Sequence, residues 1–338
     1  MKILFIGGTG NISRACTELA VSGGFEVFHL NRGTRKADIP RQVTTLHADI
    51  NNVKEVKEVI GERTFDIVAN FIAFKTGDVE RDFQLFRGRT GQYIFISSAS
   101  AYQKPLLNPV VTESTPLKNP WWDYSRDKIA CEELLNRLYR EEDFPVTIVR
   151  PSLTYETVIP VAIGSWNDFT IADRMRKGLE VVVHGDGTSL WTITHSKDFA
   201  KGFVGLLGNQ QAIGESFHIT SDELLTWDQI YQAVAEAAGT TARIVHIGSD
   251  FICRVAESVG QKWLWGSLLG DKSVSAIFDN SKIKRCVPGF VATIPFKKGI
   301  RETIEWFEAD PVRMKIVEEN NRFIDTILAK YREALKVI

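Results

Sequence analysis

The chain has 338 residues, of which 44% are hydrophobic and 25% charged, and these ordinary globular fractions exclude a disordered or fibrous protein. Its 41 Lys and Arg residues nearly balance 42 Asp and Glu residues, so the net charge is -1, which gives no global field to attract nucleic acid or anionic lipid. The cysteines are dispersed without a disulfide or metal-ligand spacing, and we expect no metal site. They are Cys16, Cys131, Cys253 and Cys286.

The chain contains no obvious targeting or membrane segment. Its first apolar run, residues 3–6, ends at Gly7 and is shorter than the apolar core of a signal peptide. No stretch approaches the ~18 apolar residues of a membrane span. We therefore expect a soluble, cytoplasmic protein without a membrane partner.

Strand and helix patterns alternate in the N-terminal half. Short apolar runs predict buried strands, and amphipathic segments between them predict helices. Repeated βα units indicate an α/β protein with a Rossmann-type, doubly wound parallel sheet. The strands are expected at residues 2–6, 25–30, 43–46, 65–69, 93–96 and 145–149, and the helices at 12–21, 53–60, 78–86 and about 123–142.

Beyond Pro151 the pattern loosens, and glycines separate shorter segments. We expect a smaller C-terminal substrate-binding lobe with helices near 227–238, 299–307 and 311–335. The predicted Rossmann domain covers residues 1–155 and is completed by segments near 190–222. The predicted lobe covers residues 156–189 and 223–338.

A glycine-rich turn with the sequence GGTGNIS occupies residues 7–13, directly after the first predicted strand. Glycines let the backbone approach a pyrophosphate, and the following helix contributes free N–H groups and its positive dipole end. Ser13 stands where a third glycine would permit close helix–strand packing, and serine is small enough for this role. A plain strand–helix turn is the alternative. The predicted cofactor-binding residues here are Gly7, Thr9, Gly10, Asn11 and Ile12.

Cationic residues, without an acid, follow the second predicted strand. An acid at this point would bind a ribose 2′-hydroxyl, whereas arginine favours a 2′-phosphate. We therefore predict an NAD(P) cofactor, with NADP favoured over NAD, although a solvated loop is the alternative. Asn31 and Arg32 are the predicted contacts, with Arg32 as the main phosphate partner and Arg35 or Lys36 assisting.

Tyr124 and Lys128 are four residues apart on a predicted helix and share one face. An unperturbed phenol has a pKa of about 10, and an adjacent ammonium lowers that pKa by stabilising the phenolate. The pair is typical of an acid–base centre, but an ordinary pair on a helix surface has the same spacing. Its interpretation therefore depends on the motifs around it.

Taken in order, the motifs resemble those of the extended short-chain dehydrogenase/reductase family, in its atypical NAD-dependent epimerase/dehydratase branch. The resemblance covers nearly the whole chain. Its elements are the glycine turn, Asp49, residues 97–102 (SSASAY), Tyr124-x-x-x-Lys128, Arg150-Pro151, and residues 185–187, 198–200, 214–219 and 299–306.

This resemblance implies a role for each matching residue. Tyr124 is expected to be the general acid/base, and Lys128 to lower its pKa and hold the nicotinamide ribose. Ser98 is expected to hydrogen-bond the reacting oxygen, with Ser100 as a second contact or a turn residue. Asp49 and Ile50 would bracket the adenine, although Asp49 fits equally well as a helix or turn cap.

Two departures from the family bear on the substrate. The family's 4,6-dehydratases carry an Asp-Glu pair where this chain has Ala99 and Ser100, which disfavours dehydration by that route. Its sugar-nucleotide enzymes carry an arginine where Trp191 stands. Tryptophan cannot neutralise a diphosphate but can stack on a ring, so Trp191 and Trp122 are either substrate contacts or packing residues. Arg150, Arg174 and Arg176 remain candidate phosphate ligands.

We expect an NAD(P)-dependent epimerase or oxidoreductase acting on a secondary alcohol or ketone of a sugar nucleotide or related metabolite. An NADPH-dependent reductase of a non-nucleotide carbonyl is the main alternative. Residues 185–198 also resemble the RNA-acting chloroplast stem-loop-binding proteins, but the charge balance argues against nucleic acid as a partner. A cofactor-sensing protein is a third alternative. The family resemblance implies a homodimer, and His195 is assigned no catalytic role because it lies at a helix start, where Ser196 or Thr194 is the expected cap.

Overall fold

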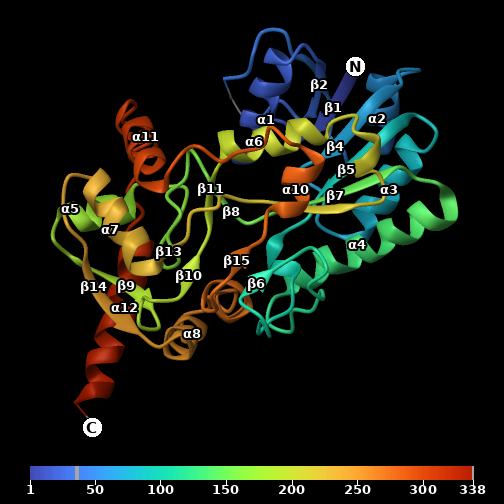
Figure 1. Cartoon of the computed structure of the whole chain (residues 1–338). Helices are drawn as coiled ribbons and strands as arrows, with labels where there is room; N and C mark the ends of the chain where they lie inside the picture. The colour runs from blue at the N-terminus through green and yellow to red at the C-terminus, as the bar shows by residue number, and fades with distance from the viewer. Residues whose placement is uncertain (35–37, 337–338) are drawn as a thin grey trace.

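A parallel sheet of seven strands, six from residues 2–151 and one from residues 216–219, is the centre of the first half of the computed structural model, which describes residues 1–34 and 38–336 (Figure 1). The strand order β12-β7-β5-β4-β1-β2-β3 places β1 inside the sheet, so the chain winds outward first to one side and then to the other. This arrangement confirms the predicted doubly wound α/β fold. The strands are β1 (Lys2–Ile6), β2 (Glu26–Asn31), β3 (Thr44–His47), β4 (Phe65–Asn70), β5 (Thr90–Ile96), β7 (Val146–Pro151) and β12 (Ser216–Ile219).

Helices cover both faces of this sheet. Leu4 and Ile6 of β1 belong to the core on one face, and Ile3 and Phe5 belong to the core on the other. Because successive side chains of a strand point to opposite faces, burial on both sides explains the uninterrupted apolar run. One face packs against α2 (Val53–Ile60), α3 (Thr76–Phe86) and α4 (Asp123–Glu142), and the other against α1 (Asn11–Ser22) and α6 (Ser196–Leu206).

All of the strands and helices predicted for the N-terminal half are present, with shifts at their ends. The largest shift among the strands is in β5, which was expected at 93–96 and begins at Thr90. The apolar pattern did not indicate residues 90–92 as part of the strand, because Gln92 is polar. Its side chain is 1% exposed, and its Nε2 donates to Thr147 Oγ1 at 3.0 Å, which satisfies the buried amide.

The C-terminal half packs around a further core cluster, which includes the buried side chains of Trp227, Ile252 and Ile324. Within it, β9 and β14 pair in parallel. The division into a domain of residues 1–155, completed near 190–222, and a lobe of residues 156–189 and 223–338 remains a prediction. The helices and strands of this half are α5 (Thr170–Arg176), β9 (Glu180–His184), α7 (Trp227–Ala237), β14 (Arg243–Ile247), α8 (Ser249–Ser258), α9 (Leu264–Ser267), α10 (Ser281–Cys286), α11 (Phe296–Glu308) and α12 (Glu318–Leu335).

The last helix begins at Glu318 and not near 311 as predicted. The intervening segment turns, because the Asp310 carboxylate accepts the Val312 N–H at 3.0 Å and competes with helical hydrogen bonding. No helix in the described part of the chain has the length and apolar character needed to span a bilayer.

Short strand pairs join distant segments of the chain. β8 (Leu153–Tyr155) pairs with β11 (Ile193–His195), β10 (Leu190–Trp191) with β13 (Leu225–Thr226), and β6 (Val110–Val111) with β15 (Ile277–Phe278). Between these pairs the carboxyl end of the parallel sheet faces the second half of the molecule. In open α/β sheets this is where ligands bind.

Candidate active site

The glycine turn links β1 to α1 and has no room for a side chain at Gly7. Gly7 has φ +83°, and a Cβ there would lie 2.6 Å from Ile72 Cγ2. Ser13 fastens the turn: its Oγ accepts the Gly10 N–H at 2.8 Å and donates to the Gly7 carbonyl at 2.8 Å. The serine thus does more than replace a glycine. A pyrophosphate binds to free backbone N–H groups at a helix N-terminus where no side chain blocks its approach. The turn therefore fits a dinucleotide.

A buried histidine that sequence reasoning missed lies beneath the turn. A Cβ on Gly8 would lie 2.4 Å from His29 Nε2, so the missing side chain at Gly8 accommodates the imidazole. His29 Nε2 is 2.9 Å from Thr17 Oγ1. Burial lowers the pKa of His29 to about 4, which keeps the ring neutral under the turn at pH 7.

A pocket of about 500 Å³ extends from the glycine turn to the ends of β2 and β3. Most of the residues predicted to contact the adenosine half line it. They are Gly7, Thr9, Gly10, Asn31, Arg32, Asp49 and Ile50. Arg81 also lines this pocket and was not predicted. Its guanidinium is held by Asp78, Asp82 and Asn51, so it acts as part of the wall.

Asp49 is a turn cap that also lines the pocket, and its contact with adenine stays a prediction. Its Oδ1 accepts the Asn51 N–H at 3.0 Å, which makes it a turn cap, and the residue also lines the pocket. Arg32 Nη1 lies 4.0 Å from Asp49 Oδ2, and the two side chains are 66% and 40% exposed. Such an exposed pair contributes only about 0–1 kcal/mol, so it restrains Arg32 weakly. Arg35 and Lys36 lie outside the described residues.

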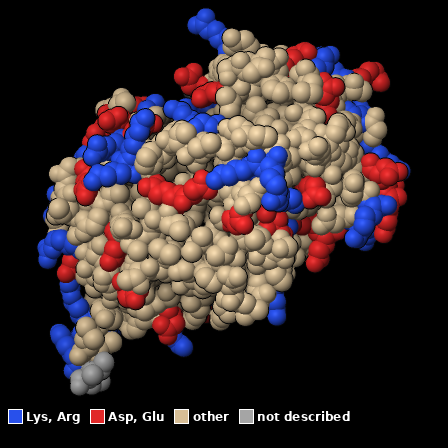
Figure 2. Space-filling view, viewed as in Figure 1, with Lys and Arg blue, Asp and Glu red and all other residues tan. Residues whose placement is uncertain are grey.

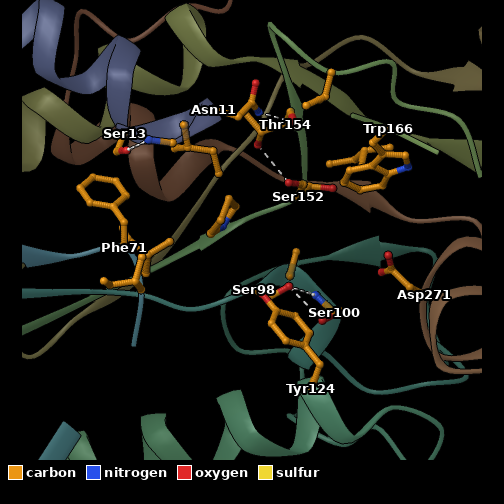
Figure 3. A pocket seen from close by; sticks show the side chains of 18 of the residues that line it. Asn11, Ser13, Phe71, Ser98, Ser100, Tyr124, Ser152, Thr154, Trp166 and Asp271 are labelled. Carbon is orange, nitrogen blue, oxygen red and sulfur yellow. Dashed lines mark hydrogen bonds between the residues drawn. The ribbon is translucent and has the colours of Figure 1, made fainter. Parts of the chain in front are cut away.

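A second pocket, of about 490 Å³, shares Gly7, Gly10 and Ile72 with the first. Ser98, Ser100 and Tyr124 lie on one wall, opposite Ser152 and Thr154 (Figure 3). Ser13 and Phe71 mark the end near the glycine turn, and Trp166 and Asp271 mark the other. The predicted residues Asn11, Ile12 and Trp122 line the same pocket. The structure thus brings the predicted catalytic tyrosine and serine into one pocket with the glycine turn.

A chain of three hydroxyl groups orients Ser98. Ser125 Oγ donates to Ser100 Oγ at 2.7 Å, and Ser100 Oγ is 2.9 Å from Ser98 Oγ. Ser98 Oγ also accepts the Ser100 N–H at 3.2 Å. When Ser100 donates along this chain, both acceptor sites of Ser98 are filled, so its own proton is directed towards the Tyr124 hydroxyl. Ser125, next to the tyrosine on α4 and fully buried, was not predicted.

Tyr124 has a raised pKa in this structure, contrary to the predicted lowering by Lys128. Burial of the phenol raises its pKa to about 12, a hydrogen bond with Ser98 opposes this, and the negative charge of Asp271 adds to it. The ring packs against Trp122 at a centroid distance of 5.0 Å. Removal of the phenol from water therefore sets the direction of the shift, and Lys128 is not among its causes.

Lys128 lies under the tyrosine ring, with Nζ 5.8 Å from the ring centroid. Its ammonium donates to the carbonyls of Ala73 at 2.7 Å and Ile96 at 2.8 Å. Burial lowers its pKa to about 8, so it remains mostly charged at pH 7. Two of its three donors are occupied, and the side chain is 1% exposed and lines neither pocket.

Other predicted substrate contacts lie elsewhere. Arg150 is 4% exposed and forms a buried ion pair with Glu132, and Trp191 packs on Trp227 at 5.7 Å. Neither lines either pocket, so packing and charge pairing explain them better than substrate binding.

The remaining candidate arginines and the histidine also have structural partners. Arg174 is paired with Asp325 and Arg176 with Glu308. His195, and not Ser196 or Thr194, caps α6, because its Nδ1 accepts the Lys197 N–H at 3.2 Å.

Charged residues from the second half of the chain also reach the pocket. Asp271 and Lys272 line the end away from the glycine turn, together with Trp166 and Asn167. Sequence reasoning pointed to Trp166 as one of several tryptophans near a ring-containing substrate, but it missed Asn167, Asp271 and Lys272, because nothing in a loosely patterned segment indicates which side chains face the Rossmann half.

Comparison with known proteins agrees with this geometry. Residues 85–220 match the model of the NAD dependent epimerase/dehydratase family. Chloroplast stem-loop binding protein of 41 kDa b from Arabidopsis thaliana is 26% identical over 259 residues, which cover 72% of this chain and 65% of that protein. The match thus spans less than two thirds of this relative.

Solved structures share the fold over nearly the full length. An epimerase from Methanothermobacter thermautotrophicus has a TM-score of 0.73 at 16% identity, with 93% of this chain and 94% of that chain covered. UDP-glucose 4-epimerase from Bifidobacterium longum, in complex with NAD+ and UDP, has a TM-score of 0.71 at 17% identity, with 92% and 99% covered. At these identities the likeness shows the fold alone. Residues 85–220 thus resemble the NAD dependent epimerase/dehydratase family, and the chain shares its fold with solved epimerases.

Proposed function

We propose that the protein is an NAD(P)-dependent epimerase or oxidoreductase acting on a secondary alcohol or ketone of a sugar nucleotide or related metabolite. The observation that carries this proposal is the placement of Tyr124 and Ser98 in a pocket that shares its walls with the glycine turn. The Bifidobacterium longum relative, a UDP-glucose 4-epimerase, supports the sugar-nucleotide class.

In this proposal the nicotinamide, when bound, supplies the acceptor or donor of a hydride. Ser98 donates its proton to the reacting oxygen, in place of its contact with Tyr124, and fixes the position of that oxygen. Tyr124 gives a proton to that oxygen when a ketone is reduced and takes one when an alcohol is oxidised. Lys128, through its remaining N–H donor, is assigned to the nicotinamide ribose. The glycine turn and Asp49 position the other half of the dinucleotide.

The handling of the cofactor distinguishes an epimerase from a net reductase. An epimerase returns the hydride to its substrate, so in that case NAD(P) would remain bound through purification and a sugar nucleotide such as UDP-glucose would be epimerised without net change in absorbance at 340 nm. Mass spectrometry of the denatured protein and chromatography of the sugar nucleotides measure both. Stoichiometric consumption of NADPH with a carbonyl compound would instead identify a reductase.

One observation favours the reductase alternative. Asp271 and Lys272 are the only charged side chains among the described residues that line the catalytic pocket, and no arginine reaches it. A diphosphate group would therefore find little positive charge there. This observation supports a non-nucleotide carbonyl compound as the substrate.

Arg32 gives a test of the proposed NADP preference. We expect Arg32→Ala to weaken NADP+ binding about 10-fold or more, because a charge-assisted hydrogen bond to the 2′-phosphate contributes roughly 1.5–3 kcal/mol. NAD+ binding should change little. Titration calorimetry with both nucleotides measures the ratio, and Arg63→Ala, which removes an arginine outside both pockets, is the control. Equal losses for both nucleotides would contradict the assignment.

RNA binding receives little support from the charge distribution. Figure 2 shows basic and acidic side chains interspersed on the face in view, without a broad basic patch, whereas phosphate backbones require clustered cations. A homodimer formed through α4 also remains a proposal, supported by the family resemblance.

A further inference from the structure

The end of the catalytic pocket away from the glycine turn carries an adjacent acid and base. Asp271 and Lys272 belong to a π-helical turn, Leu268–Lys272. In such a turn the backbone hydrogen bonds join residues five apart, and not four apart as in an α-helix. Such turns are frequent at functional sites. Figure 3 shows Asp271 at the pocket wall across from Ser98 and Tyr124.

Lys272 is fixed in position by both its backbone and its side chain. Its carbonyl accepts hydrogen bonds from His184 Nε2 at 2.9 Å and Trp227 Nε1 at 3.1 Å. Its Nζ donates to Ser267 Oγ at 3.1 Å and Asp271 Oδ2 at 3.2 Å. The side chain is 3% exposed. An ammonium has three donors, so one N–H remains for a ligand.

Asp271 complements this donor. Its Oδ2 is bound to Lys272, while its Oδ1 has no hydrogen-bond partner within residues 1–34 and 38–336. The pair therefore presents one N–H donor and one carboxylate acceptor side by side. A hydroxyl group both donates and accepts, and two neighbouring hydroxyls can satisfy both groups at once.

Aromatic side chains surround the pair. Lys272 Nζ lies 5.7 Å from the ring centroid of Trp122 and 5.4 Å from that of Trp166, and both rings line the pocket. Indole rings provide apolar surface for the C–H faces of a ligand ring. Charged hydrogen-bonding groups beside aromatic rings form a site for a ring that is apolar on its faces and hydroxylated at its edge.

The charge at this end does not suit a diphosphate. The single ammonium in the pocket wall is already paired with Asp271, whose carboxylate would repel phosphate oxygens. Lys104, which is 4% exposed, interacts electrostatically with both residues but does not line the pocket. The charge of Lys104 can offset that of Asp271. The two lysines and the aspartate then leave a net charge of about +1, which is too little to neutralise two phosphate groups.

We propose that Asp271 and Lys272 bind neighbouring hydroxyl groups of an uncharged hydroxylated ring, such as a sugar or cyclic polyol without a diphosphate, with Trp122 and Trp166 against the ring. This assignment narrows the substrate of the reaction proposed above to a metabolite without a nucleotide, and it rests on that function for its chemistry. The binding itself does not require proton transfer by Tyr124.

Titration calorimetry of the full chain, saturated with NADP+ or NAD+, tests the assignment. The probes are methyl β-D-glucopyranoside, methyl β-D-galactopyranoside and myo-inositol as uncharged rings, and UDP-glucose as the diphosphate. We expect at least one uncharged ring to bind, and UDP-glucose to bind more weakly than that ring. Asp271→Asn and Lys272→Met should each weaken the binding of the ring about 10- to 100-fold, because each removes a charge-assisted hydrogen bond.

The controls separate this idea from effects on folding and from the proposed chemistry. Asp173→Asn and Lys177→Met alter an ion pair outside both pockets and should leave binding of the ring unchanged. Unchanged NADP+ affinity in the Asp271 and Lys272 variants verifies the fold. Tighter binding of UDP-glucose, no binding of any uncharged ring, or wild-type affinity in both variants would overturn the assignment. An inactive protein that still binds the ring through Asp271 and Lys272 would instead refute the proposed reaction alone.

Discussion

Replacing Tyr124 with phenylalanine is expected to lower kcat by about 10²–10⁴-fold, the usual contribution of a positioned general acid or base. The phenyl ring keeps the contact with Trp122 but has no proton to exchange. Because burial raises the pKa of Tyr124 to about 12, the hydroxyl of the free protein is protonated at neutral pH and is ready to act as an acid. Turnover is measured with the sugar nucleotide or carbonyl compound that the wild type converts, and nucleotide affinity by titration calorimetry.

Tyr139 provides a matched control on the same helix. Its side chain is 38% exposed and lies outside both pockets, so Tyr139→Phe should leave kcat and nucleotide affinity at wild-type values. Nucleotide affinity should also be preserved in Tyr124→Phe. Full activity of Tyr124→Phe would refute the role of the phenol, and joint loss of activity and nucleotide binding would point to a damaged fold.

Replacement of Glu132 with glutamine is expected to reduce the free energy of unfolding by about 3–5 kcal/mol, as is usual when one partner of a buried ion pair is removed. The Glu132 carboxylate is fully buried and accepts hydrogen bonds from Arg150 Nε at 3.0 and 3.2 Å and from Ser97 Oγ. Glutamine would leave the Arg150 guanidinium, which cannot lose its proton, without its counter-charge. Urea unfolding followed by circular dichroism measures the change.

The control for this second variant is an exposed pair at the end of the same helix. Arg87 Nη2 and Glu142 Oε2 are 2.7 Å apart, and the two side chains are 59% and 38% exposed. Glu142→Gln should cost less than about 1 kcal/mol. Equal effects of Glu132→Gln and Glu142→Gln would show that burial does not determine the strength of the inner pair.

The Rossmann half could be predicted because its signals are local. An apolar run of strand length, a glycine turn and an amphipathic helix each lie within a few residues, and their repetition indicates a doubly wound sheet. The glycine turn and the Tyr124 helix were predictable for the same reason. The burial of Gln92 could not be predicted from local signals, because its hydrogen-bond partner Thr147 lies on another strand.

The far end of the catalytic pocket could not be predicted, because its residues come together only through long-range packing. Asp271 and Lys272 reach the pocket from a turn more than a hundred positions beyond Tyr124. Arg150 illustrates the opposite error: an arginine beside the predicted site suggested a phosphate ligand, but a glutamate on α4 neutralises it. The pKa of Tyr124 was misjudged because spacing on a helix carries no information about burial.

The side chain of Asn11 has a consequence for how the two pockets work together. It begins the helix after the glycine turn, yet its Nδ2 donates to the Thr154 carbonyl at 2.9 Å and its Oδ1 accepts the Thr157 N–H at 3.2 Å. These two hydrogen bonds link the glycine turn directly to residues 154–157 on the opposite wall of the pocket. A ligand that orders the turn would therefore favour one that orders residues 154–157, and by thermodynamic reciprocity the two would strengthen each other's binding by the same factor.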